Sequence, residues 1–187
     1  MRKAIYYLPG HGGRLNTGLG EALLTRGFDI AGRETLGEFR ELPFSEQVKI
    51  VTQDLRPHFW NRDAFVIANS FGAYLFFHAQ ASLPPYPGRV LILSPIIGDF
   101  ANEETGAFFS PPYPKKLYGL AKTGSYPAPK DAQIHVGAHD WQSVPENVTQ
   151  FGDLTGIPVA VVPNAGHMLP REYVARILDD WLPIKSP

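Results

Sequence analysis

The chain has 187 residues, of which 17 are Lys or Arg, 18 are Asp or Glu and none is Cys. This length fits one domain with a substantial hydrophobic core. The formal charge of -1 does not favour binding to nucleic acid or an anionic membrane, and the lack of cysteine excludes disulfides, thiolate metal sites and cysteine nucleophiles. We therefore expect a single domain over residues 1–187 that acts on a small molecule.

The N-terminal segment MRKAIYYLPG contains an apolar run that ends at Pro9 and Gly10. This run is too short for the core of a signal peptide or for a membrane span. It predicts a strand over residues 3–9 in a cytoplasmic protein.

Short apolar runs recur along the chain, and segments with apolar residues at helical spacing separate them. The predicted strands are KAIYYLP (3–9), AFVIA (64–68), VLILS (90–94) and VAVVP (159–163), with weaker candidates DIAGR (29–33) and QIHVGA (133–138). This alternation predicts an α/β fold with a parallel sheet covered by helices on both faces. Ligands of such sheets bind at the carboxyl ends of the strands.

Three segments show the patterns of helices. Residues 43–55 carry apolar side chains at spacings of four, three and four, and Pro57 is expected to stop this helix. Residues 171–182 form a second amphipathic helix. Residues 70–81, SFGAYLFFHAQA, are apolar on nearly all sides, which predicts a helix buried inside the fold.

The segment from residue 98 to residue 131 interrupts this alternation with many aromatic residues and prolines. A connection of this length is usually functional or disordered, and the aromatic content argues against disorder. We expect a small lid or pocket wall here, and a loop packed on the surface is the alternative.

Ser70 follows the strand 64–68 and opens the buried helix, which is the strand–turn–helix context of a nucleophile elbow. In that strained turn the residues two before and two after the serine must be small. Gly72 meets this condition, and Ala68 adds one methyl group where the motif has glycine. The alternative is a serine that caps the helix.

A serine hydroxyl needs a positioned base to become a nucleophile, normally a histidine oriented by a carboxylate. Of the six histidines, His167 directly follows the last predicted strand, 159–163. It is therefore expected at the same edge of the sheet as Ser70.

Asp140 follows the strand candidate 133–138 and is the first choice for the carboxylate, since it gives the chain order nucleophile, acid, base. Asp99 also follows a strand and is the alternative acid. Beyond Asp140, Ser143, Pro145 and Glu146 match a capping box at the start of a helix.

A tetrahedral intermediate requires backbone N–H donors, which form an oxyanion hole. The amide of Phe71, directly after Ser70, is expected to be one donor. The second is expected from the loop LPGHGG (8–13), with Gly13 as first choice and Gly12 as second, because glycines let the backbone approach a substrate.

Phosphate-binding and metal-binding patterns are not matched. Leu15 and Leu19 stand where dinucleotide and P-loop fingerprints need Gly or Ala and Lys, respectively. His135 and His139 fall in a strand and turn, where this spacing separates the side chains by roughly 13 Å. We therefore expect no cofactor and no metal.

The motifs LPGHGG, ANSFGA, GAHDWQSVP and NAGHMLP, in this order, resemble the α/β-hydrolase superfamily. The length and the PGHGG start look like its small serine hydrolases related to retinoblastoma-binding protein 9, which have almost no cap domain. The resemblance implies Ser70 as nucleophile, Asp140 as acid, His167 as base, and the amides of Phe71 and Gly13 as oxyanion hole. It also implies a three-layer α/β-hydrolase fold with a mostly parallel sheet of about six strands.

These features predict a serine hydrolase that cleaves a small ester, thioester or amide through an acyl-enzyme, with a carboxylesterase as first choice. A non-catalytic protein-interaction module on the same scaffold is the alternative, because a fold does not fix a function. A lyase or perhydrolase that uses the same site is a third hypothesis.

Overall fold

The computed structural model describes residues 3–183 and contains a central sheet of six strands. Every neighbouring pair in this sheet is parallel, and the order is β2-β1-β3-β4-β7-β8. The strands are β1 (Ala4–Leu8), β2 (Asp29–Gly32), β3 (Phe65–Asn69), β4 (Arg89–Leu93), β7 (Asp131–Gly137) and β8 (Val159–Val162). All six predicted strands are confirmed, including the two weaker candidates.

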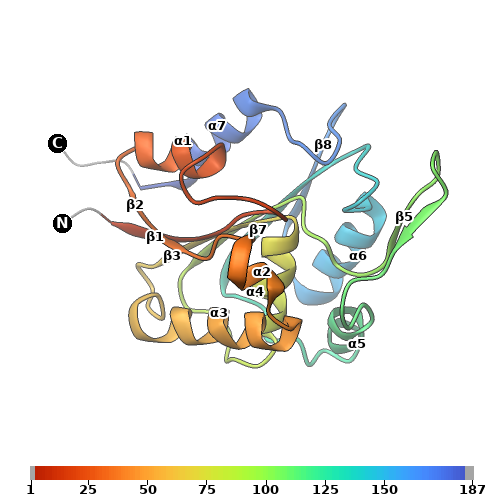
Figure 1. Ribbon diagram of the computed structural model, residues 1–187, viewed down its shortest axis with the longest axis horizontal. Helices are drawn as coiled ribbons and strands as arrows, with labels where there is room; N and C mark the ends of the chain where they lie inside the picture. Colours follow the sequence, from red (N-terminus) through yellow and green to blue (C-terminus); the bar gives the residue numbers. More distant parts are fainter. Residues whose placement is uncertain (1–2, 184–187) are drawn as a thin grey trace.

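Helices cover both faces of the sheet and give three layers (Figure 1). One face carries α1 (Leu19–Thr25) and α7 (Arg171–Trp181). The opposite side carries α2 (Gly37–Glu41), α3 (Phe44–His58), α4 (Phe71–Gln80), α5 (Lys116–Lys122) and α6 (Pro145–Thr155). The three-layer α/β fold is therefore confirmed.

The side chains of β1 divide the hydrophobic core into two clusters, because successive residues of a strand point to opposite faces. Ile5 and Tyr7 pack with residues of α1 and α7. Tyr6 and Leu8 pack with residues of α3 and α4. The sheet is therefore packed on both faces, and this packing holds the carboxyl ends of its strands in place.

Two helix predictions can be compared in detail with the structure. The residues of α4 from Gly72 to Gln80 are all buried, which confirms the central buried helix. The prediction that Pro57 stops α3 is wrong, because the helix includes Pro57 and ends one residue after it, at His58. Pro57 lies in the last turn, where its missing N–H costs one hydrogen bond without breaking the rest of the helix.

The segment 98–131 contains the short antiparallel strands β5 (Phe100–Asn102) and β6 (Ala107–Phe109), followed by α5. The β5–β6 hairpin projects from the body of the molecule (Figure 1). The rings of Phe100 and Phe109 stack with centroids 5.1 Å apart, and both lie within 6.0 Å of the Trp141 ring. This ordered hairpin is small, and residues 3–183 contain no cap domain.

Each helix in the part of the chain that the structure describes is too short or too polar to cross a bilayer.

Candidate active site

Ser70 lies in a strained turn between β3 and α4. Its φ of 52° and ψ of −116° place a non-glycine residue in a sparsely populated conformation, which is costly unless the surroundings fix it. Its N–H donates to the carbonyl oxygen of Leu93 at 3.0 Å. Ser70 occupies the N-cap position of α4, but its hydroxyl makes no capping hydrogen bond. The side chain is therefore available for another partner.

The residues around this turn are tightly packed against the end of β1. A Cβ atom at Gly72 would lie 2.2 Å from the carbonyl oxygen of Leu8 and 2.5 Å from that of Pro9, so only glycine fits. A Cβ atom at Gly10 would lie 3.2 Å from Cβ of Ser70. The methyl group of Ala68, by contrast, is fully buried and packs in the hydrophobic core. The departure from the glycine motif at this position is therefore compatible with the elbow.

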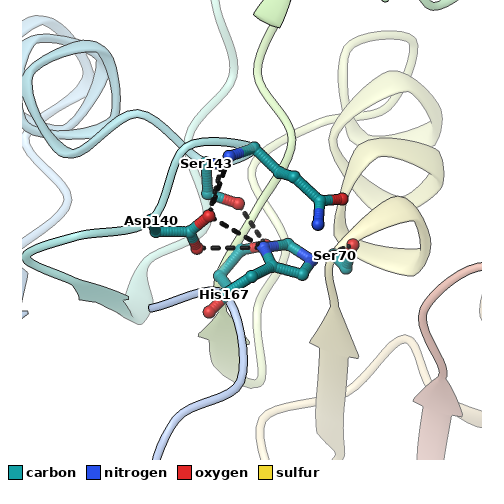
Figure 2. Close-up of polar contacts among 6 residues, drawn as sticks. Ser70, Asp140, Ser143 and His167 are labelled. Atoms are coloured by element: carbon teal, nitrogen blue, oxygen red, sulfur yellow. Dashed lines mark hydrogen bonds and ion pairs between the residues drawn. The ribbon is translucent and has the colours of Figure 1, made fainter. Parts of the chain in front are cut away.

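Three side chains from three separate loops form one chain of hydrogen bonds (Figure 2). The Ser70 hydroxyl lies 2.9 Å from Nε2 of His167. Nδ1 of His167 lies 2.9 and 3.0 Å from the two carboxylate oxygens of Asp140. Asp140 follows β7 and His167 follows β8, so the common edge of a parallel sheet brings both to the end of β3.

The Asp140 carboxylate is buried and held by backbone donors. Its Oδ1 atom accepts the N–H groups of Gln142 at 3.0 Å and of Ser143 at 2.8 Å. The Ser143 hydroxyl in turn donates to the carbonyl oxygen of Ser94 at 2.6 Å. Because a buried carboxylate needs such donors, these contacts fix both its position and its orientation toward His167.

The predicted capping box after Asp140 is wrong. Helix α6 begins at Pro145, its N-cap is Val144, and no side chain caps it. Ser143 uses its hydroxyl on Ser94 and its amide on Asp140 instead. The physical reason is that the Ser143 hydroxyl lies against the Ser94 carbonyl oxygen, and the helix begins one residue later than a cap at Ser143 requires. Sequence reasoning thus missed Ser143 as a residue that supports the acid.

The alternative acid, Asp99, makes no hydrogen bond to His167. Its Oδ1 atom is buried and has no partner among residues 3–183. Its charge adds to the effect of burial in raising the pKa of Tyr74, whose hydroxyl donates to the Pro112 carbonyl oxygen at 2.7 Å. The structure therefore places Asp140, and not Asp99, beside the histidine.

The loop after β1 corrects the expected oxyanion donors. The N–H of Gly12 donates to the carbonyl oxygen of Thr35 at 3.0 Å. The N–H of Gly13 donates to the Gly10 carbonyl oxygen at 2.9 Å and lies 3.1 Å from the Thr35 hydroxyl oxygen. Both amides therefore donate to acceptors within the protein, at Gly10 and Thr35, and neither is free to bind a substrate.

Two of the amides without an acceptor at this site belong to His11 and Phe71. Within residues 3–183 the His11 N–H meets no acceptor, and Phe71 is the first residue of α4, whose N–H has no acceptor inside the helix. The His11 and Phe71 rings lie edge to face with centroids 5.7 Å apart. His11 also directly follows Gly10, which lies against Ser70. The two residues that carry these amides are therefore close to the serine.

Thr35 holds this loop in place, although nothing in the sequence pattern singles it out. Its side chain is 1% exposed, and its hydroxyl donates to the Gly10 carbonyl oxygen. Its own N–H donates to the Gly13 carbonyl oxygen at 3.1 Å. Because Thr35 follows β2, which neighbours β1 in the sheet, it contacts the loop from the side.

A cavity of about 850 Å³ opens onto Ser70 and His167. It runs between the loop after β1, helix α1, and the segment from His167 into α7. No residue of the segment 98–131 lines it, which differs from the expected pocket wall. That segment comes near the site through a row of aromatic rings. The ring centroids of Tyr113 and Phe44 lie 6.2 Å apart, and those of Phe44 and Phe71 also lie 6.2 Å apart.

The remaining histidines do not form a metal site. Nδ1 of His135 lies 2.7 Å from the Tyr173 hydroxyl, and His78 is buried in an aromatic cluster that includes Phe44 and Tyr74. In the described part of the chain, no three acidic, histidine or cysteine side chains converge as metal ligands would.

Comparisons with known proteins support the fold. No protein-family model and no curated protein matches the sequence at a significant level. Solved structures do match: mouse α/β-hydrolase domain-containing protein 10 is 15% identical with a TM-score of 0.65, over 95% of this chain and 88% of that one. An α/β-hydrolase enzyme from a sediment metagenome of the Mar Chica lagoon is 15% identical with a TM-score of 0.63, over 97% of this chain and 90% of that one. A carboxylesterase from Nitrososphaera gargenis is 10% identical with a TM-score of 0.61, over 96% and 89%. The chain therefore has the α/β-hydrolase fold.

Proposed function

We propose that this protein is a serine hydrolase that cleaves a small ester, thioester or amide through an acyl-enzyme. The observation that carries the proposal is the continuous chain of hydrogen bonds from Ser70 through His167 to Asp140, beside a cavity large enough for a small-molecule substrate. A strained serine, a hydrogen-bonded histidine and a buried carboxylate together form the arrangement that activates a hydroxyl.

In the proposed reaction, Ser70 Oγ attacks the carbonyl carbon while Nε2 of His167 takes the hydroxyl proton. Asp140 holds the imidazole ring through Nδ1 and stabilises the imidazolium. His167 then protonates the leaving group, which departs and leaves an ester on Ser70. A water molecule, deprotonated by His167, hydrolyses this ester and restores the free serine.

The negative charge on the tetrahedral intermediate needs two donors, and we assign them to the amides of His11 and Phe71. Both N–H groups lack a partner, and both residues lie beside Ser70. This assignment replaces Gly13 and Gly12, whose amides donate to Gly10 and Thr35.

A carboxylesterase is the first choice among the hydrolase activities, because apolar side chains of α1 and α7 line the cavity and suit an apolar substrate group. The short chain and the PGHGG motif support a place among the small hydrolases related to retinoblastoma-binding protein 9. A cytoplasmic location is part of the same proposal.

The exposed aromatic residues of the hairpin favour a second candidate, a protein-interaction module on a hydrolase scaffold. Phe108 is 66% exposed and Phe109 is 44% exposed, next to the partly exposed Trp141. Clustered exposed aromatic side chains are typical of binding surfaces. This candidate predicts binding without turnover.

The two candidates are separated by hydrolysis of p-nitrophenyl acetate and butyrate by the wild type, Ser70→Ala and Ser110→Ala. Ser110 is an exposed serine outside the site and controls for the substitution itself. The proposal predicts turnover by the wild type and Ser110→Ala, and a loss of about 10³-fold or more in Ser70→Ala. No turnover by the wild type, or equal turnover by Ser70→Ala, would contradict it.

A further inference from the structure

Helices α1 and α7 lie on the same face of the sheet (Figure 1). The cavity that opens onto Ser70 and His167 runs as a groove between these two helices. Leu19 and Ala22 of α1 line one side of the cavity, and Val174, Ala175 and Leu178 of α7 line the other. The cavity is also lined by polar residues that are exposed to solvent, namely Arg14, Thr17, Glu21, Thr25 and Arg171. Apolar side chains on facing helices normally pack against each other and exclude solvent. Here they leave a space that is continuous with Ser70.

The floor of this groove is the sheet itself. Tyr7 of β1 and Leu93 of β4 line the cavity, and both side chains belong to the core cluster on the α1 and α7 face. The floor therefore consists mainly of apolar surface, and it reaches the turn that carries Ser70, whose N–H donates to the Leu93 carbonyl oxygen.

Small residues on the two walls explain why the groove is open. The guanidinium group of Arg26 donates through Nη1 to the Ala22 carbonyl oxygen at 3.1 Å and through Nη2 to the Ala175 carbonyl oxygen at 3.3 Å. One planar group thus bridges both backbones, so Ala22 and Ala175 lie on opposite sides of the same gap. A larger side chain at either position would fill it.

Arg26 also determines what the inner part of the groove can bind. Its Nε atom donates to Asp179 at 2.8 Å, so its charge is paired, and two of its other four N–H groups are used on the two carbonyl oxygens. At this point of the groove the charge of Arg26 is therefore balanced, and the apolar side chains of Ala22 and Ala175 lie beside it. An uncharged alkyl chain fits this surface.

We propose that the groove between α1 and α7 binds the alkyl chain of the substrate's acyl group, and that the enzyme prefers medium-chain acyl esters over acetyl esters. This inference rests on the proposed hydrolase function and adds the substrate class. Each methylene group removed from water would favour the longer ester by up to about fourfold, which corresponds to the transfer free energy of a buried methylene.

The first test compares kcat/KM for p-nitrophenyl acetate, butyrate, hexanoate and octanoate. The proposal predicts that kcat/KM rises with acyl length and is about tenfold or more higher for octanoate than for acetate. Ethyl and octyl acetate, in which the alkyl chain belongs to the alcohol, are expected to differ much less. Equal rates along the acyl series, or a chain-length preference only in the alkyl acetates, would overturn the acyl assignment.

The second test fills the groove. Ala22→Phe is expected to lower the ratio of octanoate to acetate kcat/KM by about tenfold or more, since the added ring occupies the gap. Ala175→Phe fills the same gap from α7 and serves if Ala22→Phe does not fold. Leu24→Phe is the matched control, because Leu24 is an exposed residue of α1 outside the cavity. An unchanged ratio in a folded groove variant would overturn the proposal.

Failure of this inference can be distinguished from failure of the proposed function. If the wild type hydrolyses acetate and octanoate equally and Ser70→Ala hydrolyses neither, the function stands and the acyl groove is wrong. If the wild type hydrolyses no ester at all, the proposed function itself is wrong.

Discussion

The amide of Ser143 donates to the Asp140 carboxylate at 2.8 Å, and the hydroxyl of the same serine donates to the Ser94 carbonyl oxygen at 2.6 Å. Ser143 therefore ties the acid of the candidate site to the end of β4, a neighbouring strand. The carboxylate that orients His167 is fixed by the sheet, as well as by its own loop.

The choice of acid can be tested by two amide substitutions. Asp140→Asn is expected to lower kcat by about 10⁴-fold, since an amide next to Nδ1 stabilises neither the correct tautomer nor the imidazolium. Asp99→Asn is expected to retain wild-type turnover, because Asp99 makes no contact with His167. Steady-state kinetics on p-nitrophenyl butyrate measure both. Retained activity in Asp140→Asn together with loss in Asp99→Asn would reverse the assignment.

The role of Thr35 in positioning the loop after β1 is tested by Thr35→Val and Thr35→Ser. Valine keeps the shape of the side chain but removes the hydroxyl. The Gly10 carbonyl oxygen then loses this donor, and the Gly13 N–H loses one of its two acceptors. We expect a loss of about tenfold in kcat with little change in KM, because the His11 amide is then held less accurately against the developing charge.

Serine keeps the hydroxyl, so Thr35→Ser is expected to restore kcat. A Thr35→Val variant that is merely less stable would lose activity only at higher temperature, with kcat unchanged at low temperature. That outcome would contradict a positioning role.

The elbow is tested at the two small residues that flank Ser70. Gly72→Ala places a methyl group 2.2 Å from the Leu8 carbonyl oxygen, so we expect a loss of about 3 kcal/mol or more in the free energy of unfolding and a loss of activity. Ala68→Gly is expected to cost about 1 kcal/mol of stability and to leave kcat within about twofold. Urea unfolding and ester kinetics check both variants. A gain in kcat of more than tenfold in Ala68→Gly would mean that the extra methyl group impairs the turn.

Stability should depend on pH through His78. Burial, with a smaller effect from the Lys116 charge, lowers the pKa of His78 from 6.5 to about 4, and its Nε2 atom has no partner among the described residues. The unfolded chain takes up a proton near pH 6.5, whereas the folded protein does so only near pH 4. The free energy of unfolding is therefore expected to fall by about 3 kcal/mol as the pH decreases through this range.

Urea unfolding at pH 7 and pH 4.5 measures this effect in the wild type, His78→Phe and His58→Gln. His78→Phe removes the titrating group and fits the aromatic cluster, so it should lose most of the pH dependence. His58 is exposed, and the His58→Gln control should keep the pH dependence of the wild type. Equal pH dependence in all three proteins would show that His78 does not control acid stability.

Much of this architecture could be predicted from the sequence because it depends on local patterns. Continuous apolar runs identify buried parallel strands, and residues that follow such strands meet at one edge of the sheet. Ser70 directly follows β3, and Asp140 and His167 lie in the loops that follow β7 and β8, so their convergence could be expected without knowledge of the strand order.

The remaining features depend on contacts between segments that no local pattern records. The sequence favours Gly13 as an oxyanion donor, but the amides of Gly12 and Gly13 both donate to Thr35, which lies in a loop distant in sequence. The cavity also differs from expectation, because its position depends on how α1 sits against α7 and on one arginine, Arg26, that bridges them. The many aromatic residues of the segment 98–131 indicate that it is ordered, as the structure shows. They do not indicate that the segment lies outside the cavity.

Ser70 acts as an activated nucleophile in the proposed reaction, and covalent labelling with a fluorophosphonate followed by peptide mass spectrometry is the most direct test of this role. We expect one phosphonyl adduct per chain, located on Ser70, with labelling greatly slowed in His167→Ala and absent in Ser70→Ala. An unlabelled wild type, or an adduct on any residue other than Ser70, would contradict it.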